Sequence, residues 1–388
     1  MIRLYKIKDY NFILVLLLAM ISIVGILLVG SANAELQSRQ IGGVIFGFLV
    51  MFVISLIDYS WLLHFYVPVY LVNLGLLLLV IIFGVTRLGA ARWITIGGFQ
   101  FQPTELSKIL IILFFSMYFM IHKEDLSTWR RIFRSLLYLG LPLFMILNQP
   151  DLKNTITMTI VFSCMYFAAG LSYKKIGIII MVIVPLVVGA VFLIVKTDLP
   201  IIDDYQKKRV MTFLNPEDDE YSESAMQQQN SIMAIGSGRF SGKGLNNNEV
   251  STANKGNFVA EIQNDFIFAV AGEELGFAGC VGIVLLLFLI IFQCFRTGKR
   301  AKDRSGSLFC YGIGTLIAVQ SFINISVATG ILPNTGTTLP FVSYGLTSLV
   351  SLFIGMGIVL NISLQRKQYF DYGGEYIYEG ETYKPEET

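Results

Sequence analysis

The sequence predicts an all-α integral membrane protein of about ten transmembrane helices, with a large extracellular loop between helices seven and eight. Hydrophobic residues make up 54% of the 388 residues and charged residues only 14%, and the mean hydropathy is +0.65. Soluble domains carry about 25% charged residues. Apolar runs long enough to span a bilayer recur through most of the chain. A soluble fold is therefore excluded, and nothing in the composition indicates nucleic acid as a partner.

The predicted helices follow from apolar runs of about 17 to 25 residues, the length that crosses a bilayer as an α-helix. Such runs lie at 11–31, 41–58, 66–85, 103–121, 133–148, 153–170, 175–195, 266–295, 306–330 and 340–364. No small-residue cleavage site follows the first run, so we expect it to remain as a membrane anchor. The run at 266–295 exceeds one crossing, and we expect it to tilt or to project above the membrane. Residues 86–102 are too polar and Gly-rich to span and predict a short segment lying on the surface.

The distribution of basic residues predicts the orientation. An even number of spans places both termini on one side, and the basic residues Arg3, Lys6 and Lys8 favour the cytoplasm for that side. The cytoplasmic segments then hold 17 Lys and Arg residues. The short outer loops hold four, which are Arg39, Arg87, Arg92 and Lys153. We therefore predict one polytopic domain at 1–365, with an extracellular loop at about 196–265, and a cytoplasmic tail at 366–388.

Polar motifs from six distant segments fall at the outer face in this topology. They are Arg92-Trp93, Gln102-Pro103-Thr104-Glu105 with Lys108, Gln149-Pro150-Asp151, Asp265, Leu332-Pro333-Asn334-Thr335-Gly336, and Pro340-Phe341-Val342-Ser343-Tyr344-Gly345. Ionisable residues in or beside membrane helices mark functional sites by default. The outer face is therefore the predicted location of the chemistry.

Lys108 and Arg92 at this face could each bind phosphate or serve a structural role. Glu105 and Lys108 are three residues apart, which places them on one helical face within pairing distance. Lys108 could hold the phosphates of a lipid carrier, or the two residues could form a structural ion pair between helices. Arg92 beside Trp93 could bind phosphate or anchor an interfacial segment. Spacing alone does not separate these alternatives.

Asp265 is expected at the outer N-terminus of the helix at 266–295. The residue could cap that helix, or it could act as a general base. A cap lowers the pKa of an aspartate and burial raises it, and the sequence leaves both open. On a regular helix Glu273 lies roughly 80° from Asp265 and Glu274 on the opposite side, so at most one of them could support it. Asp151 likewise caps a helix or takes part in catalysis.

Other polar or glycine-rich segments favour structural interpretations. The four cysteines are far apart, without metal-ligand spacing, and are expected to pack in the core. Gly272, Gly276 and Gly279 predict close helix packing. The stretch 236–244 lacks the spacing of a nucleotide-binding loop. The acidic residues between 203 and 220 predict a solvated loop surface.

Taken together, five motifs resemble those of the SEDS family, for shape, elongation, division and sporulation, which includes RodA and FtsW. They are Gly89–Ile94 leading to Gln102–Glu105 and Lys108, Gln149–Leu152, Asp265–Phe268 with Gly272–Gly276, and Leu339–Gly345. The resemblance covers nearly the whole chain, and Phe213–Glu217 and Ile57–Tyr59 favour the RodA branch. The sequence departs from the family pattern at Ala260–Asn264, at Lys153-Asn154 and at Leu346.

The resemblance implies a peptidoglycan glycosyltransferase that polymerises lipid II with inversion. Asp265 matches the family's essential aspartate, and the expected substrate and pyrophosphate site comprises Arg92, Lys108, Glu105, Gln102, Asp151, Ser343 and Tyr344. A divalent cation, Mg²⁺ or Mn²⁺, is a candidate cofactor. The implied partners are a class B penicillin-binding protein, which is a transpeptidase, and other elongation-complex membrane proteins. The implied location is the bacterial cell membrane, with both termini cytoplasmic and the active site outside.

Two other function classes are compatible with intramembrane charges. A flippase or transporter of the lipid-linked precursor would place polar residues at mid-depth and on both faces. A non-catalytic scaffold for a penicillin-binding protein would tolerate neutralisation of Glu105, Lys108 and Asp265. The concentration of polar motifs on one face favours an enzyme.

Overall fold

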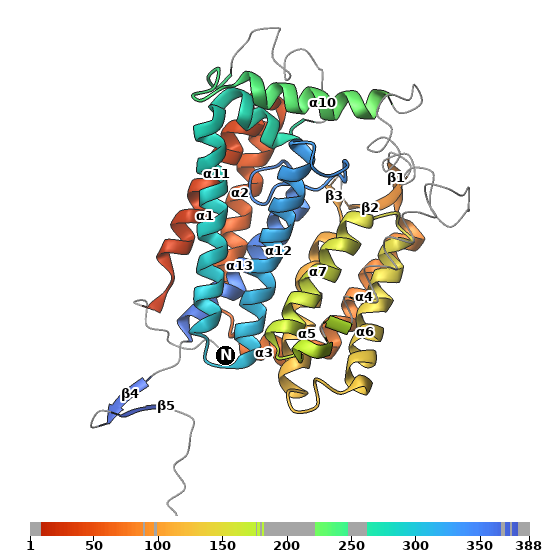
Figure 1. Ribbon diagram of the computed structural model, residues 1–388, viewed down its shortest axis with the longest axis vertical. Coiled ribbons are helices and arrows are strands. Elements are labelled where there is room, and N and C mark those ends of the chain that lie inside the picture. Colours follow the sequence, from red (N-terminus) through yellow and green to blue (C-terminus); the bar gives the residue numbers. More distant parts are fainter. Residues whose placement is uncertain are drawn as a thin grey trace, which may run out of the picture.

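The structure of the chain, a computed structural model, describes residues 9–87, 90–96, 99–175, 177–178, 181, 222–246, 262–365, 369–372 and 375–378. Its core is a bundle of helices that run side by side along one axis (Figure 1). These helices are α1 (Phe12–Ala32), α2 (Ala34–Ser55), α4 (Tyr66–Phe83), α5 (Pro103–Ile121), α6 (Trp129–Leu147), α7 (Leu152–Ala168), α11 (Ile267–Lys299), α12 (Arg304–Ala328) and α13 (Leu346–Leu364). The predicted helical membrane fold is confirmed.

Seven helices in the described part of the chain are long and apolar enough to cross a membrane: α1, α2, α4, α5, α11, α12 and α13. Outward-facing side chains such as Leu71, Phe83 and Phe133 are more than 60% exposed, as a lipid-facing surface requires. Most of the predicted span at 175–195, most of the loop at 196–265 and most of the tail at 366–388 lie outside the described residues.

Three predicted helix starts were wrong because local caps and turns override the hydrophobic pattern. Helix α2 begins at Ala34 rather than 41, since the side chain of Asn33 accepts a hydrogen bond from the first turn. Helix α6 begins at Trp129 rather than 133, where Thr128 does the same. Helix α13 begins at Leu346 rather than 340, because the residues before it form a tight turn.

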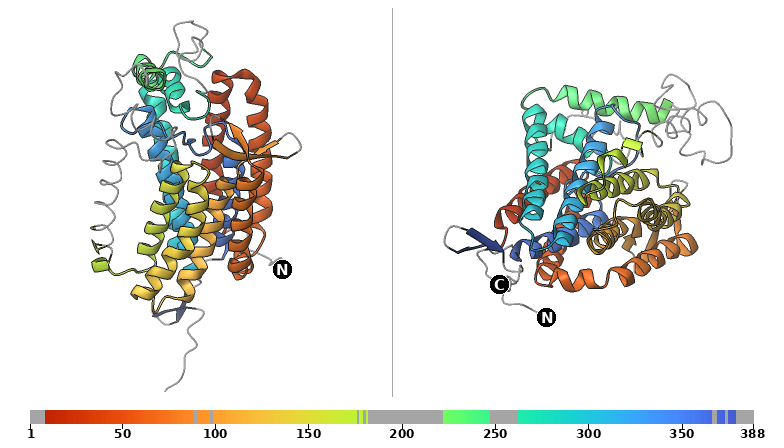
Figure 2. Two further views of the ribbon diagram at one scale, coloured as in Figure 1. Left: turned by 90° about the vertical axis from the view of Figure 1, so that its right-hand side faces the viewer. Right: turned by 60° about the horizontal axis from the view of Figure 1, so that its bottom comes forward.

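The two ends of the bundle differ in what covers them. Helix α10 (Ser222–Ser237) crosses one end, which we call the upper end, as both views show (Figures 1 and 2). A small antiparallel sheet of order β1-β2-β3 lies at this end too, formed by Val85–Arg87, Ala90–Ile96 and Phe99–Phe101. The segment predicted to lie on the surface is therefore a sheet.

The lower end carries the start of α1, the end of α13 and the short helix α3 (Tyr59–His64). The hairpin of β4 (Tyr369–Tyr372) and β5 (Glu375–Tyr378) lies beyond it. The described beginning and end of the bundle thus lie at the same end, as an even number of crossings requires. This end is also where the loops after α5 and after α11 place their basic residues.

Small residues set the closest helix contacts. Helix α13 packs against α2, and a Cβ added at Gly47 would lie 2.2 Å from the ring of Phe353. A Cβ at Gly357 would lie 2.7 Å from the carbonyl oxygen of Met51. In lipid, helices associate through packing rather than hydrophobic expulsion, so such close approach contributes directly to their association.

Helix α11 contains a break at Gly276, whose φ of 67° lies in the left-handed region. The segment after α10 docks on this break: Phe277 donates its backbone N–H to Arg239, and Ala278 donates to Phe240. Glu273 and Glu274 in turn accept backbone hydrogen bonds from Lys243 and Gly244. The docked segment satisfies the backbone groups that the break releases, so the long run at 266–295 is divided at Gly276 into a short first part and a long second part.

Candidate functional site

Five helices of the bundle, α2, α5, α7, α11 and α13, begin at the upper end, and the last four of them form the candidate site (Figure 1). Their first turns expose backbone N–H groups, and each helix contributes a partial positive charge there. Hydrogen bonds connect these starts. Gln102 before α5 donates its side-chain amide to Asp151 before α7 at 3.4 Å, and its backbone N–H to Thr347 of α13 at 3.4 Å. Tyr344 before α13 donates its N–H to the carbonyl of Gln263 before α11 at 3.0 Å.

Asp265 is half-buried in the turn that leads into α11. The N-cap position of this helix is Phe266, so Asp265 precedes the cap and the N-cap alternative is wrong. Its backbone carbonyl accepts a hydrogen bond of 2.8 Å from the side-chain amide of Asn324. The same amide donates to the carbonyl of Thr337 at 2.6 Å. The turn that carries Asp265 is thereby fixed to the loop between α12 and α13.

Asn324 is a residue that sequence reasoning missed. It is fully buried within α12. Burial of an amide in an apolar helix is costly unless its hydrogen bonds are made. An Asn inside the apolar run at 306–330 was the signal that could have identified it.

The Glu105–Lys108 pair is buried near the start of α5. The Lys108 Nζ lies 2.8 Å from Glu105 Oε2, and the two residues are 2% and 5% exposed. Lys108 also borders a cavity of about 10 Å³ that is lined otherwise by apolar side chains of α5, α7 and α12. The geometry favours the structural ion pair, and phosphate binding by Lys108 stays a prediction.

Lys153 is a second cation at this end that sequence reasoning did not include in the site. It is partly exposed on the first turn of α7, and its Nζ donates a hydrogen bond to the carbonyl of Gly336. Its charge also acts on the Glu105 carboxylate. Because Lys153 reaches the surface and Lys108 does not, it is the better placed lysine for an anionic ligand. Its sequence signal was its position beside Asp151.

Arg92 and Asp151 both stabilise the turn between α6 and α7. Arg92 of β2 donates hydrogen bonds to the backbone carbonyls of Gln149, at 3.0 Å, and of Pro150. Asp151 is fully buried and caps α7, accepting from the backbone and side chain of Asn154 at 3.3 Å and 2.8 Å. The capping alternative for Asp151 is confirmed, and Arg92 anchors the sheet to the bundle.

Ser343 and Tyr344 belong to the tight turn before α13. Ser343 is 4% exposed, and its hydroxyl accepts a hydrogen bond of 2.8 Å from the backbone of Leu339. Phe341 within this turn has a φ of 64°, a strained conformation for a residue with a side chain. The turn holds Tyr344, which is partly exposed, beside the Asp265 segment. Ser343 is therefore a residue that shapes the turn.

The acidic residues beyond Asp265 on α11 bind other partners. Glu273 forms an ion pair of 2.8 Å with Lys243, and Glu274 accepts a hydrogen bond from Ser31 of α1. These contacts attach the first part of α11 to the segment after α10 and to α1. Among the described residues, no group of three or more His, Cys, Asp and Glu side chains is arranged to hold a metal ion.

Comparison with known proteins gives consistent matches over nearly the whole chain. Residues 5–368 match the FtsW, RodA and SpoVE family, described as cell cycle proteins. The probable peptidoglycan glycosyltransferase FtsW of Geobacter sulfurreducens is 33% identical over 377 residues, covering 93% of this chain and 97% of the relative. The protein of the same name from Wigglesworthia glossinidia brevipalpis is 32% identical over 374 residues, covering 92% and 94%.

Two solved structures share the fold. The crystal structure of the rod shape determining protein RodA from Thermus thermophilus matches with a TM-score of 0.67 and 26% identity, over 92% of this chain and 98% of that one. A structure that describes the coordination of polymerization and crosslinking by a peptidoglycan synthase complex matches with a TM-score of 0.75 and 27% identity, over 91% and 97%. The relatives carry the FtsW name and the crystal structure the RodA name, so the RodA branch stays a prediction.

Proposed function

Because the chain belongs to the FtsW, RodA and SpoVE family, also called SEDS, we propose that it is a peptidoglycan glycosyltransferase that polymerises lipid II. The chain is a multi-pass membrane protein, and its relatives are named for this activity. We assign the reaction to the upper end of the bundle. Lipid II carries its disaccharide on a pyrophosphate and a long isoprenoid, so its polymerisation needs a site that is open to both lipid and water.

The observation that supports this assignment is the position of Asp265 among four helix starts. The carboxylate-bearing turn is held by Asn324 on one side and by Tyr344 on the other. A base must be held rigidly to transfer a proton efficiently, and backbone anchoring provides this. Of the three described carboxylates in the motifs at this end, Glu105 is buried in an ion pair and Asp151 is buried in a helix cap, whereas Asp265 is half-buried.

Asp265 takes the proton from the 4-hydroxyl of the GlcNAc of one lipid-linked disaccharide. The hydroxyl oxygen forms a bond to the anomeric carbon of the MurNAc of another, and the bond from that carbon to the pyrophosphate oxygen breaks. Undecaprenyl pyrophosphate leaves with inversion at the carbon. A positioned base contributes about 10²- to 10⁴-fold to such a step.

The leaving pyrophosphate gathers negative charge, which the helix starts and the partly exposed Lys153 are placed to stabilise. Asp265 together with the pyrophosphate of the substrate would hold a divalent cation, Mg²⁺ or Mn²⁺, since magnesium is commonly bound by one or two carboxylates plus substrate phosphates. The cation would neutralise the leaving group, and chelation by EDTA is the test of its need.

The proposed orientation places the upper end outside the cell and both termini in the cytoplasm. It rests on the excess of basic residues in the segments of the lower end. We also propose that the chain works with a class B penicillin-binding protein, since the peptidoglycan synthase complex that it resembles coordinates polymerization with crosslinking. Other elongation-complex membrane proteins are further expected partners.

The test is polymerisation of labelled lipid II by the purified wild type and Asp265→Ala, with and without Mg²⁺, Mn²⁺ and EDTA. We expect Asp265→Ala to lose at least about 10²-fold in rate while it inserts and purifies normally. Glu35→Ala is the matched control, because Glu35 is an exposed carboxylate at the start of α2, also at the upper end. Full polymerising activity of Asp265→Ala, with or without a partner synthase, would contradict the assignment and favour a scaffold.

A further inference from the structure

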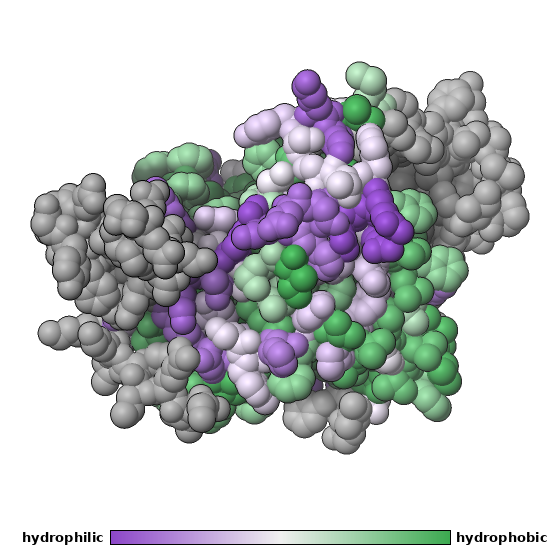
Figure 3. All heavy atoms as spheres, turned by 90° about the horizontal axis from the view of Figure 1, so that it is seen from below, coloured by the Kyte–Doolittle hydropathy of each residue, from purple (hydrophilic) through white to green (hydrophobic). Residues whose placement is uncertain are grey.

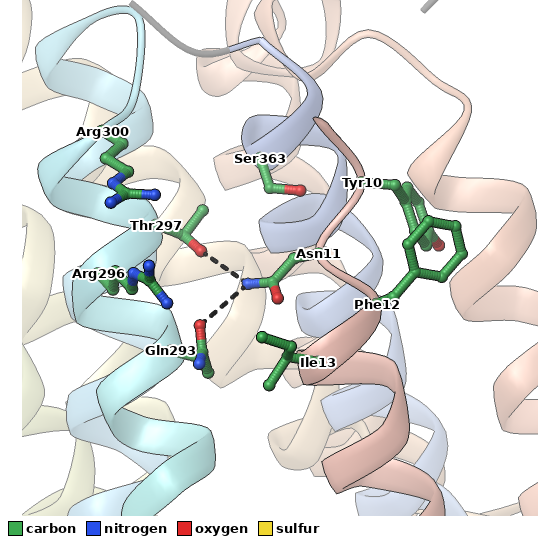
Figure 4. Close-up of a pocket in the computed structure, with 9 residues that line it drawn as sticks. All are labelled: Tyr10, Asn11, Phe12, Ile13, Gln293, Arg296, Thr297, Arg300 and Ser363. Atoms are coloured by element: carbon green, nitrogen blue, oxygen red, sulfur yellow. Dashed lines mark hydrogen bonds between the residues drawn. The ribbon is translucent and has the colours of Figure 1, made fainter. Parts of the chain in front are cut away.

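A pocket of about 320 Å³ lies at the lower end of the bundle, remote from the site described above (Figure 4). It is formed by the start of α1, the last turns of α11 and the end of α13. Its volume is in the range of small-ligand sites. The catalytic assignment at the upper end makes no use of it.

The pocket is basic. Arg296 and Arg300 both line it and reach from α11 toward the α1 side (Figure 4). The two residues are one helical turn apart, so their guanidinium groups lie on one face. Within the part of the chain that the structure describes, neither forms an ion pair. Asp9 precedes the lining residues in the chain and is not one of them.

Polar groups complete the wall between the arginines and α1. The Asn11 side-chain amide donates to Gln293 Oε1 at 3.3 Å and to Thr297 Oγ1 at 3.4 Å. Gln293 and Thr297 are 7% and 5% exposed, so they are built into the wall. Both side chains retain a donor of their own, the Gln293 amide and the Thr297 hydroxyl. The pocket therefore offers two cations and two neutral donors, which suits an anion with several oxygen atoms.

Apolar side chains border the pocket on the side that faces lipid. Phe12 and Ile13 line it and are 58% and 54% exposed, and Leu16 continues the same surface of α1 at 60%. Seen from below, hydrophilic residues form a band across this end of the bundle, beside hydrophobic flanks (Figure 3). A ligand that fills the site would thus need a charged headgroup and apolar chains.

We propose that this pocket binds the phosphodiester headgroup of an anionic phospholipid, with its acyl chains along the exposed side of α1. Basic pockets between membrane helices bind such headgroups through the same combination of charge and adjacent lipid. Arginines near a helix C-terminus also interact favourably with the helix dipole. Lys299, in the same last turn, serves that purpose too, but it does not line the pocket.

The experiment measures lipid binding by the purified full-length chain in detergent, using native mass spectrometry and the thermal unfolding midpoint. The probes are dioleoylphosphatidylglycerol, dioleoylphosphatidylcholine, glycerol 3-phosphate and inorganic phosphate. The variant is Arg296→Gln with Arg300→Gln. The matched control is Lys123→Gln with Lys299→Gln, which removes two exposed positive charges from the same end.

We expect the wild type to bind the phosphatidylglycerol at least about tenfold more tightly than the phosphatidylcholine. One cation near a membrane surface contributes about 1 kcal/mol, so the double arginine variant should bind the anionic lipid about 30-fold more weakly and each single variant about fivefold. The lysine control should stay within about threefold of the wild type.

Three results would overturn the proposal. Equal binding of the two lipids would show that the net charge of the headgroup does not contribute to binding. An equal loss in the lysine control would show that the lipid responds to the overall charge of this end and not to the pocket. If glycerol 3-phosphate or inorganic phosphate raised the thermal unfolding midpoint as much as the phosphatidylglycerol does, the site would be assigned to a soluble anion. Because the arginines are exposed, the variants should fold, and the single variants test the same expectation separately.

Discussion

Neutralising one member of the buried Glu105–Lys108 pair should destabilise the protein strongly, whereas neutralising both should not. The two charged groups are 2.8 Å apart and almost completely inaccessible. Removing one partner of a buried pair costs about 3–5 kcal/mol because the other charge stays buried without compensation. Replacing both with neutral residues of similar volume costs little or stabilises.

The surroundings of each residue predict which single change costs more. In Lys108→Met, the carboxylate of Glu105 still feels the positive charge of Lys153, so the lower value of about 3 kcal/mol is expected. In Glu105→Gln, the ammonium of Lys108 faces an apolar cavity lined by residues such as Phe115 and Met158, and about 5 kcal/mol is expected. The double variant should recover most of the loss.

The assay is a double-mutant cycle on the free energy of unfolding in detergent, with lipid II polymerisation per folded protein measured in parallel. If the Glu105–Lys108 pair acts only on stability, the stable double variant should polymerise lipid II at a rate close to that of the wild type. Single variants as stable as the wild type would refute the reasoning about the buried pair. A stable double variant without activity would show instead that the pair takes part in the reaction.

Three further predictions follow from particular contacts. Gly276→Ala should destabilise by about 2 kcal/mol or more, because its φ is 67° and a Cβ would lie 2.3 Å from the backbone nitrogen of Gly242; thermal unfolding measures this. Asn324→Leu should reduce polymerisation by about 10²-fold, since the turn of Asp265 loses its anchor; lipid II assays on folded protein measure it. A hydrogen bond from Arg131 holds the pKa of Asp125 below its usual range, so the stability that it contributes should disappear as the pH falls through that lowered pKa.

The controls come from the same chain. Gly282→Ala should leave stability unchanged or improve it, because it lies in the same helix with nothing near an added Cβ. Asn73→Leu should stabilise the folded protein. Both polar atoms of the Asn73 side chain, Nδ2 and Oδ1, are buried without a hydrogen-bond partner in the described structure. For Asp125, the difference in thermal midpoint between the wild type and Asp125→Asn should be complete above about pH 4 and should shrink progressively as the pH falls below that value. A Gly276→Ala protein as stable as Gly282→Ala, a fully active Asn324→Leu, or a pH-independent Asp125 difference would each contradict its prediction.

The sequence by itself determined the membrane fold class, the approximate helix positions and the end at which the polar motifs meet. Length and hydrophobicity of a run are local properties, and lipid imposes them on each helix separately. The positions of Gln102, Asp151 and Asp265 at one end then followed from the order of the crossings. For this reason, the structure confirmed the grouping of these motifs.

Only the tertiary structure decided what the polar residues do at that end. Asp151 caps a helix, Glu105 and Lys108 pair inside the bundle, and Asn324 holds the turn of Asp265. The break at Gly276 depends on a segment that docks from far along the chain. Spacing in one helix cannot foresee such contacts, because burial and hydrogen-bond partners come from segments that are neighbours only after folding.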